Sequence, residues 1–399
     1  MKAKAFSAII LFLSMFFLTG CYDAKEIDET AYILALGIDK KSDSTYSYTF
    51  QFSTPLAVSE EPEKKSENPE ESGKSSESKS KSSTNLTINA PDFYVARNLT
   101  NNFLSKNIDM SHLKLIVFAS DIEPQDLENH SRLLMHEREV RPHTAIAVSA
   151  SAASDFLENV NPEPESNTSK YYELMWLRSN NAYAPTKQLH DFVDELTSDP
   201  RDTVLPIALK GKDLTKFPAD NKIQGWTGTA HTSVKTDSSI LCGMAVFKNG
   251  KLAGAMDGDS AMIYNILKNN IKNCTITIEN THQAGQTISF RVIIPQKADF
   301  DVNHQAKEIS ITQELHAEFL GTSLPKGYNS FDELYSDFRK MITNRTQQFL
   351  SDISKKTGAD ILALHRKTRP QFQTLQDWKS FNWNEFYQNA EISVNINLI

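Results

Sequence analysis

The sequence predicts an α+β fold made of three consecutive mixed α/β domains, the last an antiparallel sheet packed against one long helix. Strict alternation of apolar and polar residues marks strands in several parts of the chain, and segments with apolar residues at helical spacing lie between them. The 399 residues are enough for two or three domains at about 150 residues each. The content of 39% apolar and 23% charged residues is ordinary for a globular protein.

Residues 1–20 are predicted to be a lipoprotein signal peptide. Lys2 and Lys4 precede an apolar stretch at 5–18, which is shorter than the roughly 20 residues that a membrane-spanning helix needs. The stretch ends in Leu-Thr-Gly followed by Cys21, which is typical of a lipobox. We therefore expect Cys21 to carry lipid and to become the first residue of the mature chain. Removal of two lysines and no acid would change the net charge from −8 to −10, so lipid rather than charge would hold the protein on a membrane.

An N-terminal α+β domain is predicted over residues 21–198. An apolar run at 32–38 and strict alternation at 46–53 indicate a hairpin, and Asp92 is placed to cap a helix. The other expected elements are strands at 113–119 and 144–149, a helix with Pro124 in its first turn, and helices at 153–160 and 187–197. Together they predict a β-α-β unit.

Residues 59–84 are predicted to form a disordered insert within this first domain. They are dominated by Ser, Glu and Lys and contain no large apolar side chain. Such a segment cannot bury enough apolar surface to offset the entropy lost on ordering. The simplest interpretation is a solvated spacer without a binding role.

A small strand-rich middle domain is predicted over residues 199–270. Strands are expected at 203–209, 225–233, 243–247 and 251–256. The pair Asn249-Gly250 favours a tight hairpin between the last two, because such a turn needs positive φ at both central residues. Asp259 is then expected to cap a helix.

The C-terminal α+β domain is predicted over residues 271–399. Alternation indicates three antiparallel strands around 274–278, 288–294 and 309–319, and a final strand at 392–398. Apolar residues at helical spacing predict one long helix over 331–353, which would cover the sheet.

The sequence offers no recognisable catalytic or metal-binding apparatus. The net charge of −8 and the pI near 5.7 argue against nucleic-acid binding, and three cysteines are too few for a disulfide-stapled scaffold. Common nucleophile, zinc, phosphate-loop and dinucleotide motifs are absent. We therefore predict no catalytic residue, no cofactor, no metal site and no enzymatic activity.

Several residues have both a functional and a structural interpretation, and the structural one is favoured in each case. His136 lacks the second histidine of a zinc motif, and His316 is better explained as an exposed charge partner on its strand than as a metal ligand. Asp299 and Asp301 could in principle form an acid/base pair, but their spacing is commonplace in a strand-to-loop segment. The segment 257–259 is better explained by a turn and a helix cap than by a calcium loop. Cys242 and Cys274 could form a disulfide, but buried free thiols are favoured. The aromatic residues Trp378, Phe381, Trp383 and Phe386 could anchor a partner, but packing in the core is favoured.

Several short motifs follow one another in the order of a known family. They are Cys21-Tyr22-Asp23, Glu26-Ile27, Gly37-Ile38-Asp39, Glu139-Val140-Arg141-Pro142, Gly243-Met244-Ala245-Val246-Phe247-Lys248, Gly250-Lys251-Leu252, Gly358-Ala359-Asp360 and Phe381-Asn382-Trp383. In these residues the exported chain resembles the Ger(x)C family, the lipoprotein C subunits of bacterial spore germinant receptors. Two departures are Tyr22, where the family usually has Trp, and the long insert at 59–84.

The resemblance implies a non-enzymatic protein of three α+β domains, lipid-anchored on the outer face of the spore inner membrane. It would work with two polytopic subunits, A and B, in a complex that converts a nutrient signal into germination. The lipidated Cys21 is the one functional residue that carries over. Two other classes stay open: a solute-binding lipoprotein of a membrane transporter, which would need a ligand cleft between two lobes, and an envelope hydrolase, for which no nucleophile and base are visible.

Overall fold

The computed structural model describes residues 29–53, 83–160, 167–177, 181–210 and 239–399. Three predictions concern residues that lie outside these ranges: the signal peptide with Cys21, most of the insert, and the strand at 225–233. Ser83 and Thr84, which were expected at the end of the disordered insert, belong instead to a strand. Within the described residues, no helix is both long enough and apolar enough to cross a membrane.

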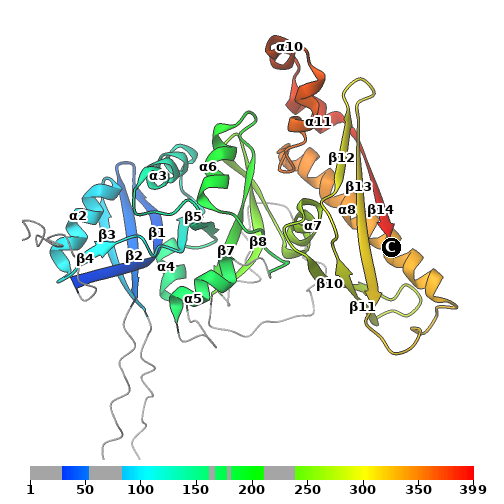
Figure 1. Cartoon of the computed structure of the whole chain (residues 1–399), viewed down its shortest axis with the longest axis horizontal. Helices are drawn as coiled ribbons and strands as arrows, with labels where there is room; N and C mark the ends of the chain where they lie inside the picture. Colours follow the sequence, from blue (N-terminus) through cyan, green and yellow to red (C-terminus); the bar gives the residue numbers. More distant parts are fainter. Residues whose placement is uncertain (1–28, 54–82, 161–166, 178–180, 211–238) are drawn as a thin grey trace, which may run out of the picture.

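The first half of the chain forms a mixed sheet, which has nine strands among the described residues. Its order is β3-β2-β1-β5-β6-β7-β8-β9, with β4 beside β1 (Figure 1). The central strands β1, β5, β6 and β7 run parallel, and both edges continue antiparallel. The strands are β1 (Thr30–Ser42), β2 (Thr45–Ser53), β3 (Ser83–Ala90), β4 (Asn107–Asp109), β5 (Leu115–Ala119), β6 (Ala145–Ser149), β7 (Thr203–Lys210), β8 (Ser239–Lys248) and β9 (Lys251–Met256).

Helices cover both faces of this sheet, as expected where parallel strands are buried on both sides. One face packs against α2 (Phe93–Phe103), α3 (Pro124–His136) and α6 (Leu189–Thr197). The other face packs against α4 (Ala153–Glu158), α5 (Thr168–Tyr172) and the short π-helix Glu173–Leu177. The predicted cap of α2 is confirmed, because Asp92 accepts a hydrogen bond from the N–H of Val95. The predicted place of Pro124 in the first turn of a helix is also confirmed, since Pro124 begins α3.

The strands expected for a separate middle domain extend the first sheet. Strand β7 pairs with β6, and β8 and β9 continue outward from it. The predicted hairpin is confirmed, with Asn249 at φ 51° and Gly250 at φ 77°. The sheet therefore does not end at residue 198, and the division into domains at 21–198, 199–270 and 271–399 stays a prediction.

Helix α7 (Gly258–Lys268) connects the first sheet to the C-terminal part. Its N-cap is Asp257, whose Oδ1 accepts a hydrogen bond from the N–H of Ser260 at 2.8 Å. The prediction of Asp259 as the cap is wrong by two residues, since Asp259 lies in the first turn of the helix. Apolar side chains are buried around the whole helix, as is typical of a helix enclosed by other elements.

The C-terminal part contains a second sheet covered by one long helix (Figure 1). In the continuous range 239–399 its strands are β10 (Asn273–Glu279), β11 (Thr287–Ile293), β12 (Asp299–Asn303), β13 (Glu308–Phe319) and β14 (Glu391–Leu398). The pairs β10-β11 and β11-β13 are antiparallel, as predicted, and β12 also pairs with β13 in antiparallel. Strand β14 pairs with β13 in parallel, so the sheet is not antiparallel throughout, and β12 was missed.

Helix α8 (Phe331–Asp352) packs its apolar face on this sheet, which confirms the predicted long helix. Its C-terminal residues belong to another apolar cluster, which also contains Val204 and Met244 of the first sheet and Tyr264 of α7. The two sheets are therefore joined through a continuous buried apolar cluster. The chain then continues through the short π-helix Ile353–Thr357, α9 (His365–Thr368), the 3-10 helix Arg369–Gln371, α10 (Leu375–Ser380) and α11 (Trp383–Asn389).

Candidate functional site: the junction between the two sheets

Two buried aspartates, Asp202 and Asp360, connect the two halves of the molecule. Asp202 precedes β7, and its carboxylate accepts hydrogen bonds from the backbone N–H of Asn249 at 3.0 Å and of Asp360 at 2.8 Å. Both aspartates are buried. Burial raises the pKa of Asp202, because removal from water disfavours the charged carboxylate, and the two backbone donors oppose this shift. Asp202 thus holds the β8-β9 turn and the C-terminal part together.

The carboxylate of Asp360 organises the segment that follows it. It accepts hydrogen bonds from the N–H of Leu364 at 2.9 Å and from the N–H and Nδ1 of His365, both at 2.8 Å. Because a carboxylate at this position satisfies the free N–H groups at the start of α9, it acts as a cap from several residues upstream. The ring of His365 in turn contacts Trp383, at a centroid distance of 6.3 Å.

Gly358 is required for this arrangement by its backbone conformation. Its φ is +64°, which residues with a side chain rarely adopt, and it ends the short π-helix after α8. A Cβ at this position would overlap the flexible ends of the Gln388 and Lys248 side chains, which would have to move. Three of the motifs identified in the sequence, those that contain Lys248, Gly250 and Gly358, therefore meet at this junction.

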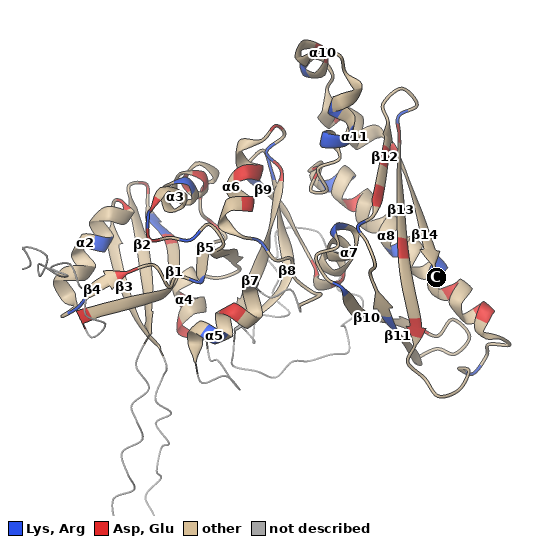
Figure 2. Cartoon of the chain, viewed as in Figure 1, with Lys and Arg blue, Asp and Glu red and all other residues tan. Residues whose placement is uncertain are grey.

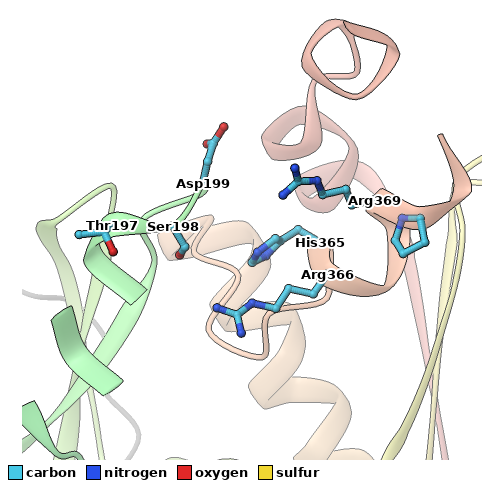
Figure 3. A pocket seen from close by; sticks show the side chains of 7 residues that line it. Thr197, Ser198, Asp199, His365, Arg366 and Arg369 are labelled. Atoms are coloured by element: carbon cyan, nitrogen blue, oxygen red, sulfur yellow. The ribbon is translucent and has the colours of Figure 1, made fainter. Parts of the chain in front are cut away.

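A cleft of about 540 Å³ opens beside these two aspartates, with His365 in its lining. It is lined on one side by the end of α6 and on the other by α9 and the turn after it (Figure 3). Its lining residues are Thr197, Ser198, Asp199, His365, Arg366, Arg369 and Pro370. Arg366 crosses the junction to Asp194, at 3.4 Å, but both side chains are largely exposed. The cleft presents two guanidinium groups, and the hydroxyl of Ser198 donates to the carbonyl oxygens of Glu195 and Pro200.

A second buried aspartate, Asp39, fixes helix α4 on the first sheet. Its carboxylate accepts hydrogen bonds from the N–H groups of Ala153 at 2.6 Å and Ser154 at 3.0 Å, at the start of the helix. A Cβ on Gly37 would lie 3.0 Å from Cδ1 of Leu157, so glycine allows α4 to approach β1 closely. The motif Gly37-Ile38-Asp39 thus has a structural explanation in the packing of one helix.

The predicted chemical candidates are not brought together. Asp299 and Asp301 lie on the exposed face of β12, and His136 and His316 are also exposed. No group of three or more His, Cys, Asp or Glu side chains in the described ranges is placed to hold a metal ion. Cys242 and Cys274 are buried free thiols, as favoured from sequence. The predicted lipidation site, Cys21, lies outside the described residues.

The aromatic residues before the last strand pack in the core. Trp378, Trp383 and Phe386 are buried, and Phe381 packs against them. The ring of Trp383 stacks on that of Tyr387, at a centroid distance of 5.9 Å. Core packing, the interpretation favoured from sequence, is confirmed.

Sequence reasoning did not single out the Asp202–Asp360 pair. One of the two residues, Asp360, lies in the motif Gly358-Ala359-Asp360, which was identified only through the family resemblance. Asp202 lies in no motif that we recognised. Its partner is 158 residues away, and no local pattern reports such a pairing.

Two family models match the chain. The first, described as "Spore germination protein N-terminal domain", matches residues 23–209. The second, described as "Spore germination B3/ GerAC like, C-terminal", matches residues 242–399. The chain belongs to the Ger(x)C family of spore germination proteins. The carboxylate of Asp202 lies in the first matched region and the N–H of Asp360 in the second, so this hydrogen bond joins the family's two modules.

Individual relatives agree with this assignment to the Ger(x)C family. "Putative spore germination protein YfkR" of Bacillus subtilis (strain 168) is 22% identical over 99% of this chain and 95% of its own length. "Spore germination protein KC" of the same organism is 38% identical over 55 residues, 14% of each chain. The crystal structure of the GerBC protein has a TM-score of 0.51 and 14% identity, and the match covers 91% of this chain and 96% of that one. This structural likeness confirms the fold class.

Proposed function

We propose that this Ger(x)C protein is the lipid-anchored accessory C subunit of a nutrient germinant receptor, needed for spore germination. It would be attached through lipid on Cys21 to the outer face of the spore inner membrane and would work with polytopic A and B subunits. The observation that carries the proposal is the match of both family modules, in order, over most of the chain. The lipobox ending at Cys21 supports the anchor.

The geometry of the junction supports a fixed arrangement of the two halves. A solute-binding lipoprotein closes two lobes around its ligand, and such closure needs an interface that can open. Here an apolar cluster and the Asp202–Asp360 hydrogen bond join the two sheets. Separating them would expose apolar surface and unpair buried polar groups. These observations favour a rigid ectodomain over the solute-binding alternative.

The decisive experiment is a detergent pull-down of the C-terminally tagged protein from inner membranes of dormant spores. We expect two polytopic proteins to be recovered with the tagged chain. The variant Cys21→Ala should be lost from the membrane fraction or left unprocessed, and Cys274→Ala serves as a matched cysteine control that should stay membrane-bound. Recovery of transporter subunits, or lipid-linked retention of Cys21→Ala, would contradict the proposal.

A further inference from the structure

Helix α2 presents an apolar stripe to solvent. Its inner face is buried through Phe93, Ala96 and Thr100. Its outer face carries four exposed apolar side chains, which are Tyr94 (50% exposed), Val95 (37%), Leu99 (36%) and Phe103 (70%). Val95, Leu99 and Phe103 follow one another at intervals of four residues, so they form one continuous stripe. Isolated exposed apolar residues are normal, but a stripe ending in an exposed phenylalanine indicates a surface that another phase or molecule covers.

The stripe lies at the end of the molecule where the described chain begins. Thr30, the first residue of β1, pairs with Asn107 of β4, four positions after Phe103. The side chain of Asn101 accepts a hydrogen bond from the N–H of Ile108 and so holds the end of α2 against β4. Figure 1 shows α2, β4 and β1 at the end of the molecule opposite the C-terminal sheet.

The predicted lipid anchor restricts how far this end can lie from a bilayer. Cys21 precedes Thr30 by nine positions, and nine residues of fully extended chain span at most about 32 Å. This step rests on the proposed function, because it requires Cys21 to carry the lipid. The start of β1, and with it the end of α2, must then stay near the membrane surface, whereas the C-terminal sheet has no such restriction.

The charge of the helix also fits a membrane surface. A chain with net charge −8 is repelled by anionic lipid as a whole, but α2 contains no acidic residue. Its one charged residue, Arg97, is paired with Glu137 and Glu139. Figure 2 accordingly shows α2 with a single blue segment and no red. The exposed side is thus uncharged: it carries the apolar stripe and Tyr94, with the neutral polar side chains of Asn98 and Asn102 between them. Tyr94 and Phe103 are the aromatic side chains that favour the interface.

We propose that the outer face of α2, formed by Tyr94, Val95, Leu99 and Phe103, inserts into the lipid headgroup region of the bilayer to which Cys21 is anchored. Lipid and helix then form a two-point attachment. Because a second contact fixes orientation as well as distance, the first sheet lies against the membrane and the C-terminal sheet projects away from it.

The test uses the full-length lipidated protein with a single cysteine label. Phe103→Cys is labelled with a fluorophore and the protein is reconstituted into vesicles of phosphatidylglycerol and phosphatidylethanolamine that contain acyl-chain nitroxide lipid. Cys242 and Cys274 will not compete for the label, because burial raises the pKa of each thiol to about 12. Leu320→Cys, at an exposed apolar position beyond β13, is the matched control.

We expect the nitroxide to quench most of the emission from position 103 and little from position 320, and Leu99→Ser to reduce the quenching at 103. Vesicle flotation without quenching at 103 would overturn this proposal and leave the anchor intact. Failure to float would overturn the anchor and this proposal together. Equal quenching at both positions, or shielding of position 103 only when A and B subunits are added, would show that α2 is not a specific lipid contact.

Discussion

The carboxylate of Asp202 and the backbone N–H of Asp360 form a 2.8 Å hydrogen bond between residues 158 positions apart. The same carboxylate binds the N–H of Asn249, while the carboxylate of Asp360 caps α9. One side chain therefore connects the β8-β9 turn of the first sheet to the segment after α8. Because these groups are buried, each depends on the others for its hydrogen-bond partner.

Replacing Asp202 by alanine should destabilise the protein by about 2–4 kcal/mol, because it leaves two backbone N–H groups without an acceptor. Urea denaturation, followed by intrinsic fluorescence, measures this change. Asp194→Ala is the matched control: it also removes a contact across the junction, but the Asp194–Arg366 ion pair is largely exposed and should contribute less than about 1 kcal/mol. Similar losses in both variants would contradict the role assigned to Asp202.

Asp39→Ala should destabilise the packing of α4 on the first sheet. The substitution removes a buried acceptor from the N–H groups of Ala153 and Ser154, and we expect a loss of about 2 kcal/mol or more in the free energy of unfolding. The control is Asp92→Ala, which removes the exposed cap of α2 and should cost about 1 kcal/mol. A smaller effect at Asp39 than at Asp92 would show that the carboxylate does not fix the helix.

The sequence predicted those elements whose signals are local. Alternating burial on β10, β11 and β13 follows directly from alternating residue types, and the turn at Asn249-Gly250 follows from the demand for positive φ. Strand β12 was missed because it contributes only two inward apolar residues, Phe300 and Val302. Asp257 and Asp259 are the same residue type, so the sequence does not distinguish them as caps. The cap is the one whose carboxylate accepts a hydrogen bond from the backbone N–H of Ser260, which is Asp257.

Long-range pairing explains the remaining differences from prediction. Strand β7 joins β6 through only two residue pairs, Val148 with Ile207 and Ser149 with Ala208, so nothing local indicates that the sheet continues past residue 198. Alternation along β14 reveals its buried face but not its parallel direction. The Asp202–Asp360 bond likewise exists only once both halves have folded.

Stability should fall as the pH drops below about 6.5, because of His130. Its Nδ1–H donates to the carbonyl oxygen of Asp126, so Nε2 accepts from the hydroxyl of Tyr48 and the buried ring is neutral. Burial lowers the pKa of His130, and nearby Lys40 adds to this effect while Asp126 opposes it. Between its folded pKa and the unfolded value near 6.5, the unfolded chain binds more protons, so stability rises with pH across that window.

Urea midpoints measured from pH 8 to pH 5 test this expectation. His130→Gln should flatten the part of the profile just below pH 6.5, whereas His316→Gln, at an exposed position, should leave it unchanged. An identical profile in wild type and His130→Gln would show that the ring does not contribute.

Shortening the predicted insert should leave the melting temperature nearly unchanged. Ser53 and Ser83 are paired neighbours on β2 and β3, so a short connection can join them. Deletion of 59–82 retains all of β3, and each halving of a flexible loop favours folding by only about 0.6 kcal/mol. Replacement of the same residues by Gly and Ser at equal length is the control. A drop of several degrees in either variant would mean that the segment packs on the domain.

Cys242 and Cys274 should remain unreactive thiols in the native protein. Both are buried and free, and burial raises the pKa of each to about 12, so the thiolate that attacks a disulfide reagent is scarce near neutral pH. In the Cys21→Ala variant we expect almost no rapid reaction with a chromogenic disulfide before unfolding, and two thiols per chain after unfolding without reductant. A sample that is reduced before unfolding gives the reference number of thiols per chain. Because a Cys242–Cys274 disulfide would survive unfolding, zero thiols in the unreduced sample would show that the exported chain is oxidised at this pair.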